Sequence, residues 1–280
     1  MRRGVRRALG SAGRALLLTG FLLAVLLPIY WMTATSFKPH QEIINAQELT
    51  YYPRAFTVES YRQLFNMYNY GEMLGNSVIV SVATGLCVTL LSILGGYGLA
   101  RYKFRGKTLM LLFFLVTQMI PGILVILPLY VIFSKLKLIN THFSLFVFYL
   151  IMNLPFCVIT MRSFFERIPY TLEEAAYVDG CTKAQGLFRI VLPVMFPGIV
   201  AVFVFAFIGA WNELIAGTIF ISTSNRWTIP VGLKSLIGKY DVKWGVLMSG
   251  GVLALLPTAV MFAVMQRFVV EGLTAGAVKE

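Results

Sequence analysis

The chain has 280 residues, of which 58% are hydrophobic and only 13% are charged, and its formal net charge is +12. Soluble domains average about 25% charged residues; here the apolar residues come in long runs, which excludes an ordinary soluble fold and predicts an all-α polytopic membrane protein. The basic residues flank these runs, so membrane topology explains the charge better than nucleic-acid binding does.

The N-terminal residues 1–14 are basic and precede an apolar run from Ala15 to Thr33. A signal peptide is the alternative, but the run is longer than a usual signal-peptide core and no clear Ala-x-Ala cleavage site follows it. We therefore expect an uncleaved first span that leaves residues 1–14 in the cytosol.

Six apolar segments are long enough to cross about 30 Å of hydrocarbon as helices. Prolines at 121, 128, 155 and 257 are expected to kink or loosen the third, fourth and sixth of them. The turn Arg101–Lys107 carries four basic residues and no acid, which assigns it and both termini to the cytosol. The expected spans are Ala15–Thr33, Leu74–Ala100, Leu109–Phe133, Leu145–Met161, Val191–Phe220 and Val246–Phe268.

Two loops then lie on the outer side. Residues 38–72 are polar and aromatic, and they form either a lid or contact surface for an external protein, or an aromatic belt at the membrane interface. Residues 222–243 are basic, with Arg226, Lys234, Lys239 and Lys243. The first of these loops is too short to be an independent domain.

The sequence contains no convincing catalytic, cofactor-binding or metal-binding pattern. Arg105-Gly106-Lys107-Thr108 resembles the end of a phosphate-binding loop, but Arg101 stands where the pattern needs glycine and no strand precedes it. The two histidines lie in loops and form no cluster with the three cysteines. We expect a transport subunit and not an enzyme, so that any ATP dependence belongs to a partner.

The cytosolic segment 162–193 is predicted to form two short helices with a sharp elbow. Thr171 and Glu174 have the spacing of a capping box, and Thr182 and Gln185 repeat it. Gly180 lies between the two boxes, where a helix would end on a left-handed residue.

The same segment resembles the EAA loop of ATP-binding-cassette (ABC) import permeases, and we call residues 162–193 the EAA loop. The whole chain is similar to the maltose-type carbohydrate permeases, specifically their smaller six-span partner, including the stretch Ala210–Leu214 and the tail Glu271–Lys279. This resemblance implies one type I ABC importer transmembrane domain over residues 1–280. The motif positions are Glu174, Ala175, Ala176, Asp179, Gly180, Ile190, Leu192 and Pro193.

The resemblance also implies the partners. These are two ABC ATPases that bind ATP and Mg, a second permease that is a different chain (a second copy of this chain is the alternative), an extracytoplasmic sugar-binding protein, and membrane lipid. Glu174 would pair with a basic residue of an ATPase, although it could instead only close the capping box on Thr171. The cytosolic tail 269–280 would insert between the ATPases, or would simply fray. The loop 222–243 would reach toward the binding protein, or would only be solvated.

The implied function is import of a disaccharide or oligosaccharide across the cytoplasmic membrane. Import of another polar solute, such as a glycerol phosphate ester or an amino acid, is an alternative because those systems share the EAA pattern. An ion-coupled carrier is a further alternative, but Glu213 is the only acidic residue inside an expected span.

Polar residues inside the expected spans are candidates for a translocation pathway. Glu213, with Trp211 and Asn212, either lines a wet cavity facing a sugar or forms an interhelical hydrogen-bond clamp between subunits. Gln118 and Asn153 are further candidates, with helix packing as the alternative role.

Overall fold

The computed structural model describes residues 2–45, 49–238 and 242–277, with side chains for residues 13–45, 49–238 and 242–266. Over these residues the chain is helical, and the sole β pairing is an isolated bridge between Ile237 and Val242. The predicted all-α class is confirmed.

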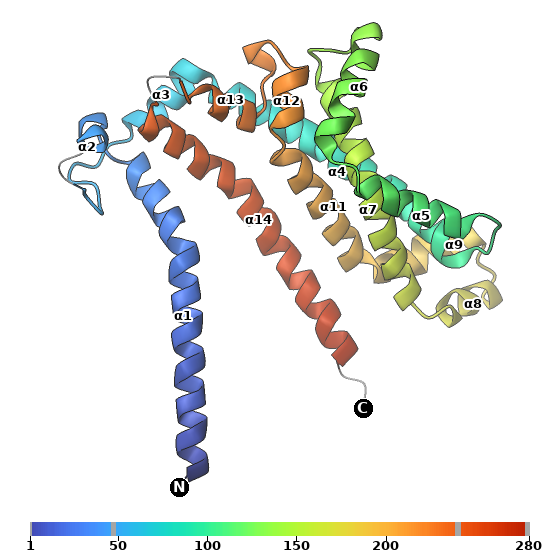
Figure 1. The fold of residues 1–280 in the computed structure, drawn as a ribbon. Coiled ribbons are helices and arrows are strands. Elements are labelled where there is room, and N and C mark those ends of the chain that lie inside the picture. Colours follow the sequence, from blue (N-terminus) through green and yellow to red (C-terminus); the bar gives the residue numbers. More distant parts are fainter. Residues whose placement is uncertain (1, 46–48, 239–241, 278–280) are drawn as a thin grey trace. The chain divides into compact units, whose positions relative to one another are not determined.

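Four helices are long and apolar enough to cross a membrane within the described part of the chain. Two further candidates are bent pairs, Lys107–Gln118 with Gly122–Lys135 at 96° and Lys183–Val194 with Phe196–Trp211 at 77°, so that the number of spans is six if each pair is one span. The long helices are α1 (Arg2–Ser36), α4 (Tyr70–Arg101), α7 (His142–Arg167) and α14 (Trp244–Ala277) (Figure 1). The bent pairs contain α5 (Lys107–Gln118), α6 (Gly122–Lys135), α9 (Lys183–Gly186), η1 (Leu187–Val191), α10 (Leu192–Val194) and α11 (Phe196–Trp211).

The expected fifth span is wrong in its extent. Helix α11 ends at Trp211, and a separate short helix, α12 (Ile215–Phe220), follows after a break. The carboxylate of Glu213 accepts hydrogen bonds from backbone N–H groups at the start of α12, which stabilises a new helix start instead of a continuous helix. The third span breaks before Pro121, as its proline predicts, whereas Pro155 and Pro257 lie inside continuous helices.

The chain divides into two compact units, residues 1–70 with 233–256, and residues 71–232 with 257–280. Because each unit is described by itself, the single domain expected over residues 1–280 stays a prediction. In the first unit, the Tyr70 hydroxyl at the start of α4 donates to the carbonyl oxygen of Gly250 at 3.2 Å. This unit also contains α2 (His40–Ile44) and α3 (Glu59–Tyr68).

In the second unit, α7 is the central helix and contacts α5, α6, α11 and α12. Glycines on α4 allow close helix packing: a Cβ atom on Gly85 would lie 2.8 Å from the Phe203 ring, and one on Gly96 would lie 2.9 Å from the backbone nitrogen of Arg162. The unit also contains α8 (Thr171–Val178) and η2 (Ser224–Arg226), and the boundary between the two units falls inside α13 (Ile229–Ser235). Its core includes Val88, Tyr97, Cys157, Met161, Phe165, Leu187, Val191 and Val202.

Candidate functional site

The elbow of the EAA loop is capped on both sides. At the end of α8, Gly180 has a φ of +85°, and the N–H groups of Gly180 and Cys181 donate to the carbonyl oxygens of Tyr177 and Ala176 at 3.1 and 2.9 Å. This is a Schellman motif, which satisfies the last carbonyls of the helix. Helix α9 then starts with the predicted capping box between Thr182 and Gln185. The predicted elbow and second capping box are confirmed.

The first predicted capping box is wrong. Helix α8 begins at Thr171 with helical backbone, Tyr170 precedes it as the N-cap, and no side chain caps this end. The N–H groups of Glu173 and Glu174 both donate to the Tyr170 carbonyl oxygen, at 2.9 and 3.1 Å. The helix therefore starts one residue earlier than the box requires, and Glu174 does not close on Thr171.

The motif residues of α8 divide between an exposed and a buried face. Glu174 and Ala175 are exposed, whereas Ala176 is buried. Within the described part of the chain, the Glu174 carboxylate forms no hydrogen bond or ion pair. Val178, at the end of the same helix, is 88% exposed. A free carboxylate beside exposed apolar groups on a rigid helix suits contact with another protein.

The remaining motif positions lie at the elbow and the helices after it. Asp179 is the exposed C-cap of α8. Ile190 in the π-helix η1 is half-buried, and Leu192 in α10 packs against the core that α4, α7 and α11 share, while Pro193 is exposed. These positions connect the elbow to the foot of α11.

Sequence reasoning missed Glu173, which is completely buried. Its Oε1 accepts from Arg101 Nε at 2.6 Å, and its Oε2 accepts from the hydroxyls of Tyr97 and Tyr177 at 2.9 and 3.3 Å. Burial raises the pKa of Tyr177, and the charge of Glu173 raises it further although a hydrogen bond with Tyr97 lowers it, so this hydroxyl stays protonated and can donate. The available signal was the helical spacing that puts Glu173, Ala176 and Tyr177 on one face of α8.

Replacing Gly180 with valine is expected to distort the elbow, because a β-branched residue at positive φ costs about 1–2 kcal/mol. Gly180→Asn is the matched control, since asparagine tolerates the left-handed region. Hydrogen–deuterium exchange at the Gly180 and Cys181 amides should accelerate in the valine variant and stay near wild type in the asparagine variant. Equal exchange in both would show that the φ of Gly180 does not hold the elbow.

Two of the candidate pathway residues lie together. Asn153 on α7 and Glu213 after α11 line a cavity of about 310 Å³ with Tyr149. The Tyr149 hydroxyl donates to Glu213 Oε2 at 3.1 Å, and the Asn153 amide donates to the Tyr149 carbonyl oxygen at 2.7 Å. The other candidates do not line this cavity: Trp211 is buried and stacks on Phe207, and Asn212 and Gln118 are exposed.

Glu213 has a structural role in this unit. Its carboxylate accepts from the N–H groups of Ile215, Ala216 and Gly217 at 2.8 to 3.3 Å. These hydrogen bonds satisfy three backbone N–H groups, which would cost free energy if they were unpaired in an apolar environment. If the carboxylate also contacts a transported solute, it must do so while it accepts these backbone hydrogen bonds.

Glu213→Ala is expected to destabilise the protein by about 2 kcal/mol or more, because these amides and the Tyr149 hydroxyl lose their acceptor. Asn212→Ala changes the exposed neighbour in the same break and should have little effect. The measurement is the thermal midpoint of the detergent-solubilised protein. A Glu213→Ala midpoint equal to that of Asn212→Ala would contradict the capping role.

The loop 38–72 is held by polar contacts within its own unit. Lys38 is buried and donates to the Thr50 carbonyl oxygen at 2.5 Å, and the Thr50 hydroxyl donates to Glu42 at 2.6 Å. Burial acts to raise the pKa of Glu42, but hydrogen bonds from Thr50 and from the backbone of Arg54 hold it below its ordinary value. These contacts tie the described residues on the two sides of this loop to each other.

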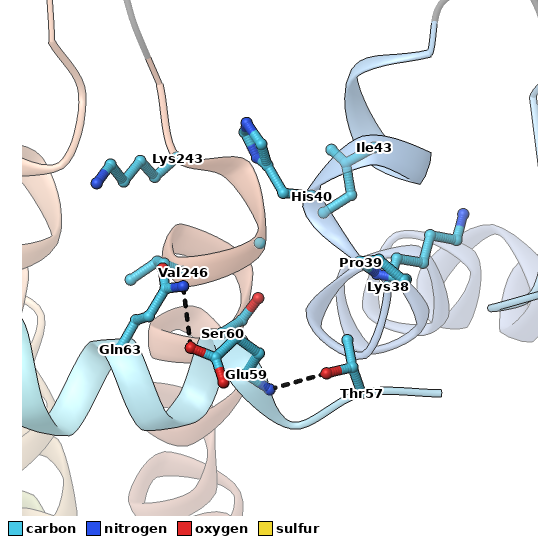
Figure 2. Close-up of a pocket in the computed structure, with 11 residues that line it drawn as sticks. Lys38, Pro39, His40, Ile43, Thr57, Glu59, Ser60, Gln63, Lys243 and Val246 are labelled. Carbon is cyan, nitrogen blue, oxygen red and sulfur yellow. Dashed lines mark hydrogen bonds between the residues drawn. The ribbon is translucent and has the colours of Figure 1, made fainter. Parts of the chain in front are cut away.

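A cavity of about 460 Å³ opens beside this loop. Figure 2 shows His40 and Lys243 lying across from Glu59 and Gln63, with a hydrogen bond from the Gln63 amide to the Glu59 carboxylate. The lining thus combines cationic, anionic and amide groups.

Comparison with known proteins identifies the family. Residues 89–274 match the model of the family described as "Binding-protein-dependent transport system inner membrane component". The chain belongs to this family. It is 36% identical over 276 residues to the inner membrane ABC transporter permease protein YcjP of Escherichia coli, covering 98% of each chain. It is 34% identical over 257 residues to the diacetylchitobiose uptake system permease protein DasC of Streptomyces coelicolor, covering 92% of this chain and 93% of the relative.

The fold of this permease is also that of a solved importer. A chain of the crystal structure of a bacterial ABC transporter involved in import of the acidic polysaccharide alginate superposes with a TM-score of 0.78. The match covers 92% of this chain and 95% of the other, at 19% identity. The expected ABC importer fold is confirmed. The family match includes α8, the elbow and the cavity at Glu213. In the predicted tail, α14 continues to Ala277, and residues 278–280 lie outside the described residues.

Proposed function

We propose that this chain is one permease subunit of an ATP-driven, binding-protein-dependent importer that carries a disaccharide or oligosaccharide across the cytoplasmic membrane. The sugar class is supported by the relative named for diacetylchitobiose uptake and by the alginate importer with the same fold. The observation that carries the coupling is the exposed Glu174 on α8, which has no hydrogen-bond or ion-pair partner among the described residues and is followed by a capped elbow.

Two ATPases, which hold the ATP and Mg, are the proposed partners of α8. Their basic surface would pair with Glu174, while the exposed Val178 and Leu172 would fill an apolar cleft. When ATP closes the ATPases, they would push α8, and the capped elbow would pass the displacement to α11 through η1 and α10. Hydrolysis would then reset the inward-facing state.

The orientation proposed for the chain puts α8, the turn Arg101–Lys107 and both termini in the cytosol. Lys183 on α9 lies over the ring of Tyr102, with 5.6 Å from Nζ to the ring centroid, so the basic turn and the EAA loop are at the same end of the second unit. The loops 38–72 and 222–243 would then face an extracytoplasmic sugar-binding protein. A second, different permease chain would complete the pore, and lipid would cover the remaining apolar surface.

The test is a pull-down of the tagged chain from native membranes in mild detergent, with identification of every co-purifying protein. An ATPase, a second permease and a sugar-binding protein together support the proposal. A binding protein specific for an amino acid or a glycerol phosphate ester would support the alternative substrate class. Recovery of the chain alone, under conditions that preserve complexes, would favour an ion-coupled carrier and overturn the proposal.

A further inference from the structure

A buried ion pair joins α8 to the end of α4. Arg101 and Glu173 lie 72 positions apart in the sequence, yet Arg101 Nε is 2.6 Å from Glu173 Oε1, and their side chains are 10% and 0% exposed. Both oxygens of the Glu173 carboxylate accept hydrogen bonds, because the hydroxyls of Tyr97 and Tyr177 donate to Oε2. The guanidinium also donates from Nη2 to the carbonyl oxygen of Ile168 at 2.9 Å, at the end of α7 and three residues before α8 begins. We call Arg101, Glu173, Tyr97 and Tyr177 the α4–α8 clasp.

The clasp differs in kind from the other ion pair of this region. Arg162 and Glu166 form an (i, i+4) pair on α7 whose side chains are 26% and 43% exposed, and such pairs contribute little. In contrast, removing one partner of a buried pair leaves an uncompensated charge and is strongly unfavourable. Helix α8 therefore cannot leave the end of α4 without breaking the clasp.

The clasp provides a connection that the covalent chain lacks. Helix α8 follows α7 directly in the sequence and continues through the elbow to α11, but α4 is separated from it by α5, α6 and α7. Helix α4 packs on α7 through its glycines and ends at Arg101, next to α8. A displacement of α8 can reach α4 indirectly through α7, and the clasp adds a direct contact between the two helices.

We propose that Glu173 and Arg101 are positioning residues that make α8 and the cytosolic end of α4 move together, so that ATPase closure moves this span as well as α11. This inference rests on the proposed function, because it requires an ATPase at α8. Coupling is reciprocal. If closure of the ATPases must move α4, then the resting packing of α4 opposes closure and restrains ATP hydrolysis.

The test uses the complete complex purified with its ATPases, MgATP as the only added ligand, and no sugar. We expect E173Q, which removes the charge but keeps the shape of the side chain, to raise hydrolysis about fivefold or more, with the ATPase content per permease unchanged. R101K keeps the positive charge but loses the planar donor pair, so its rate should lie between wild type and E173Q. A purely structural role predicts lower yield and lower activity, not a higher rate.

Two further variants distinguish loss of the clasp from a general effect of substitution in this region. E166Q breaks the exposed pair on α7 and should hydrolyse ATP at the wild-type rate, and Y97F serves as the milder clasp variant if E173Q does not accumulate. A wild-type rate in both E173Q and Y97F, or an equal rise in E166Q, overturns the clasp. In contrast, absence of an ATPase from the wild-type complex overturns the proposed function and the clasp with it.

Discussion

Replacing Glu174 with alanine is expected to release the ATPase from the chain while leaving the membrane helices intact. The carboxylate is exposed and unpaired in the described structure, so its loss removes no internal contact. If it pairs with a basic residue in the ATPase cleft, truncation leaves that partner buried without a counter-charge. Truncating one member of such a pair costs about 2–5 kcal/mol, which corresponds to a loss of affinity of about 30-fold or more.

The measurement for Glu174→Ala is the amount of ATPase recovered per permease in the pull-down, with uptake measured in the same cells. Glu166→Ala is the matched control, because it removes an acid from the end of α7 outside the EAA motif. We expect the control to retain ATPase and uptake. Wild-type recovery of ATPase with Glu174→Ala would remove the docking role from this residue.

The second large effect is expected for Gly96→Val. A Cβ atom at Gly96 would lie 2.9 Å from the backbone nitrogen of Arg162 and 3.0 Å from two side-chain atoms of Met161. The backbone of α7 cannot turn away as a side chain can, so α4 and α7 must separate. Overpacking of this kind costs about 1–3 kcal/mol.

Gly98→Val is the matched control for this packing prediction. Gly98 lies two residues further along α4, and a Cβ atom there would have no neighbour within 4 Å. Both variants put the same residue in the same helix, so differences in helix propensity cancel. The thermal midpoint of Gly96→Val should fall by about 5 °C relative to Gly98→Val, and equal midpoints would show that close packing at Gly96 contributes nothing.

Much of the local structure of the EAA loop follows from local sequence. The Schellman end at Gly180 and the capping box at Thr182 and Gln185 depend on residues within a few positions of each other, so residue type and spacing predict them. The same local reasoning failed at Thr171, where the helix starts one residue before the expected cap. The sequence has the hydroxyl of Thr171 and the carboxylate of Glu174 at the spacing of a capping box. In the structure, however, the backbone carbonyl of Tyr170 accepts the hydrogen bonds from the N–H groups of Glu173 and Glu174.

The break after α11 shows a different limit. The run Val191–Phe220 is apolar enough for one span, and Glu213 is its sole charge. Whether a carboxylate in such a run faces a pathway or caps a helix depends on which donors surround it. Tyr149 comes from another helix, so its hydrogen bond to Glu213 could not be predicted from the run itself.

By itself, the sequence determined the membrane class, the six apolar segments and the elbow, because length, hydropathy and short-range caps are local properties. Only the tertiary structure decided that Glu173, and not its neighbour Glu174, is buried against Arg101. The two glutamates have the same chemistry and differ only in the direction that they take around α8. The direction decides which glutamate is buried only when α4 is packed beside α8, because a charge can be buried only where partners from distant parts of the chain compensate it.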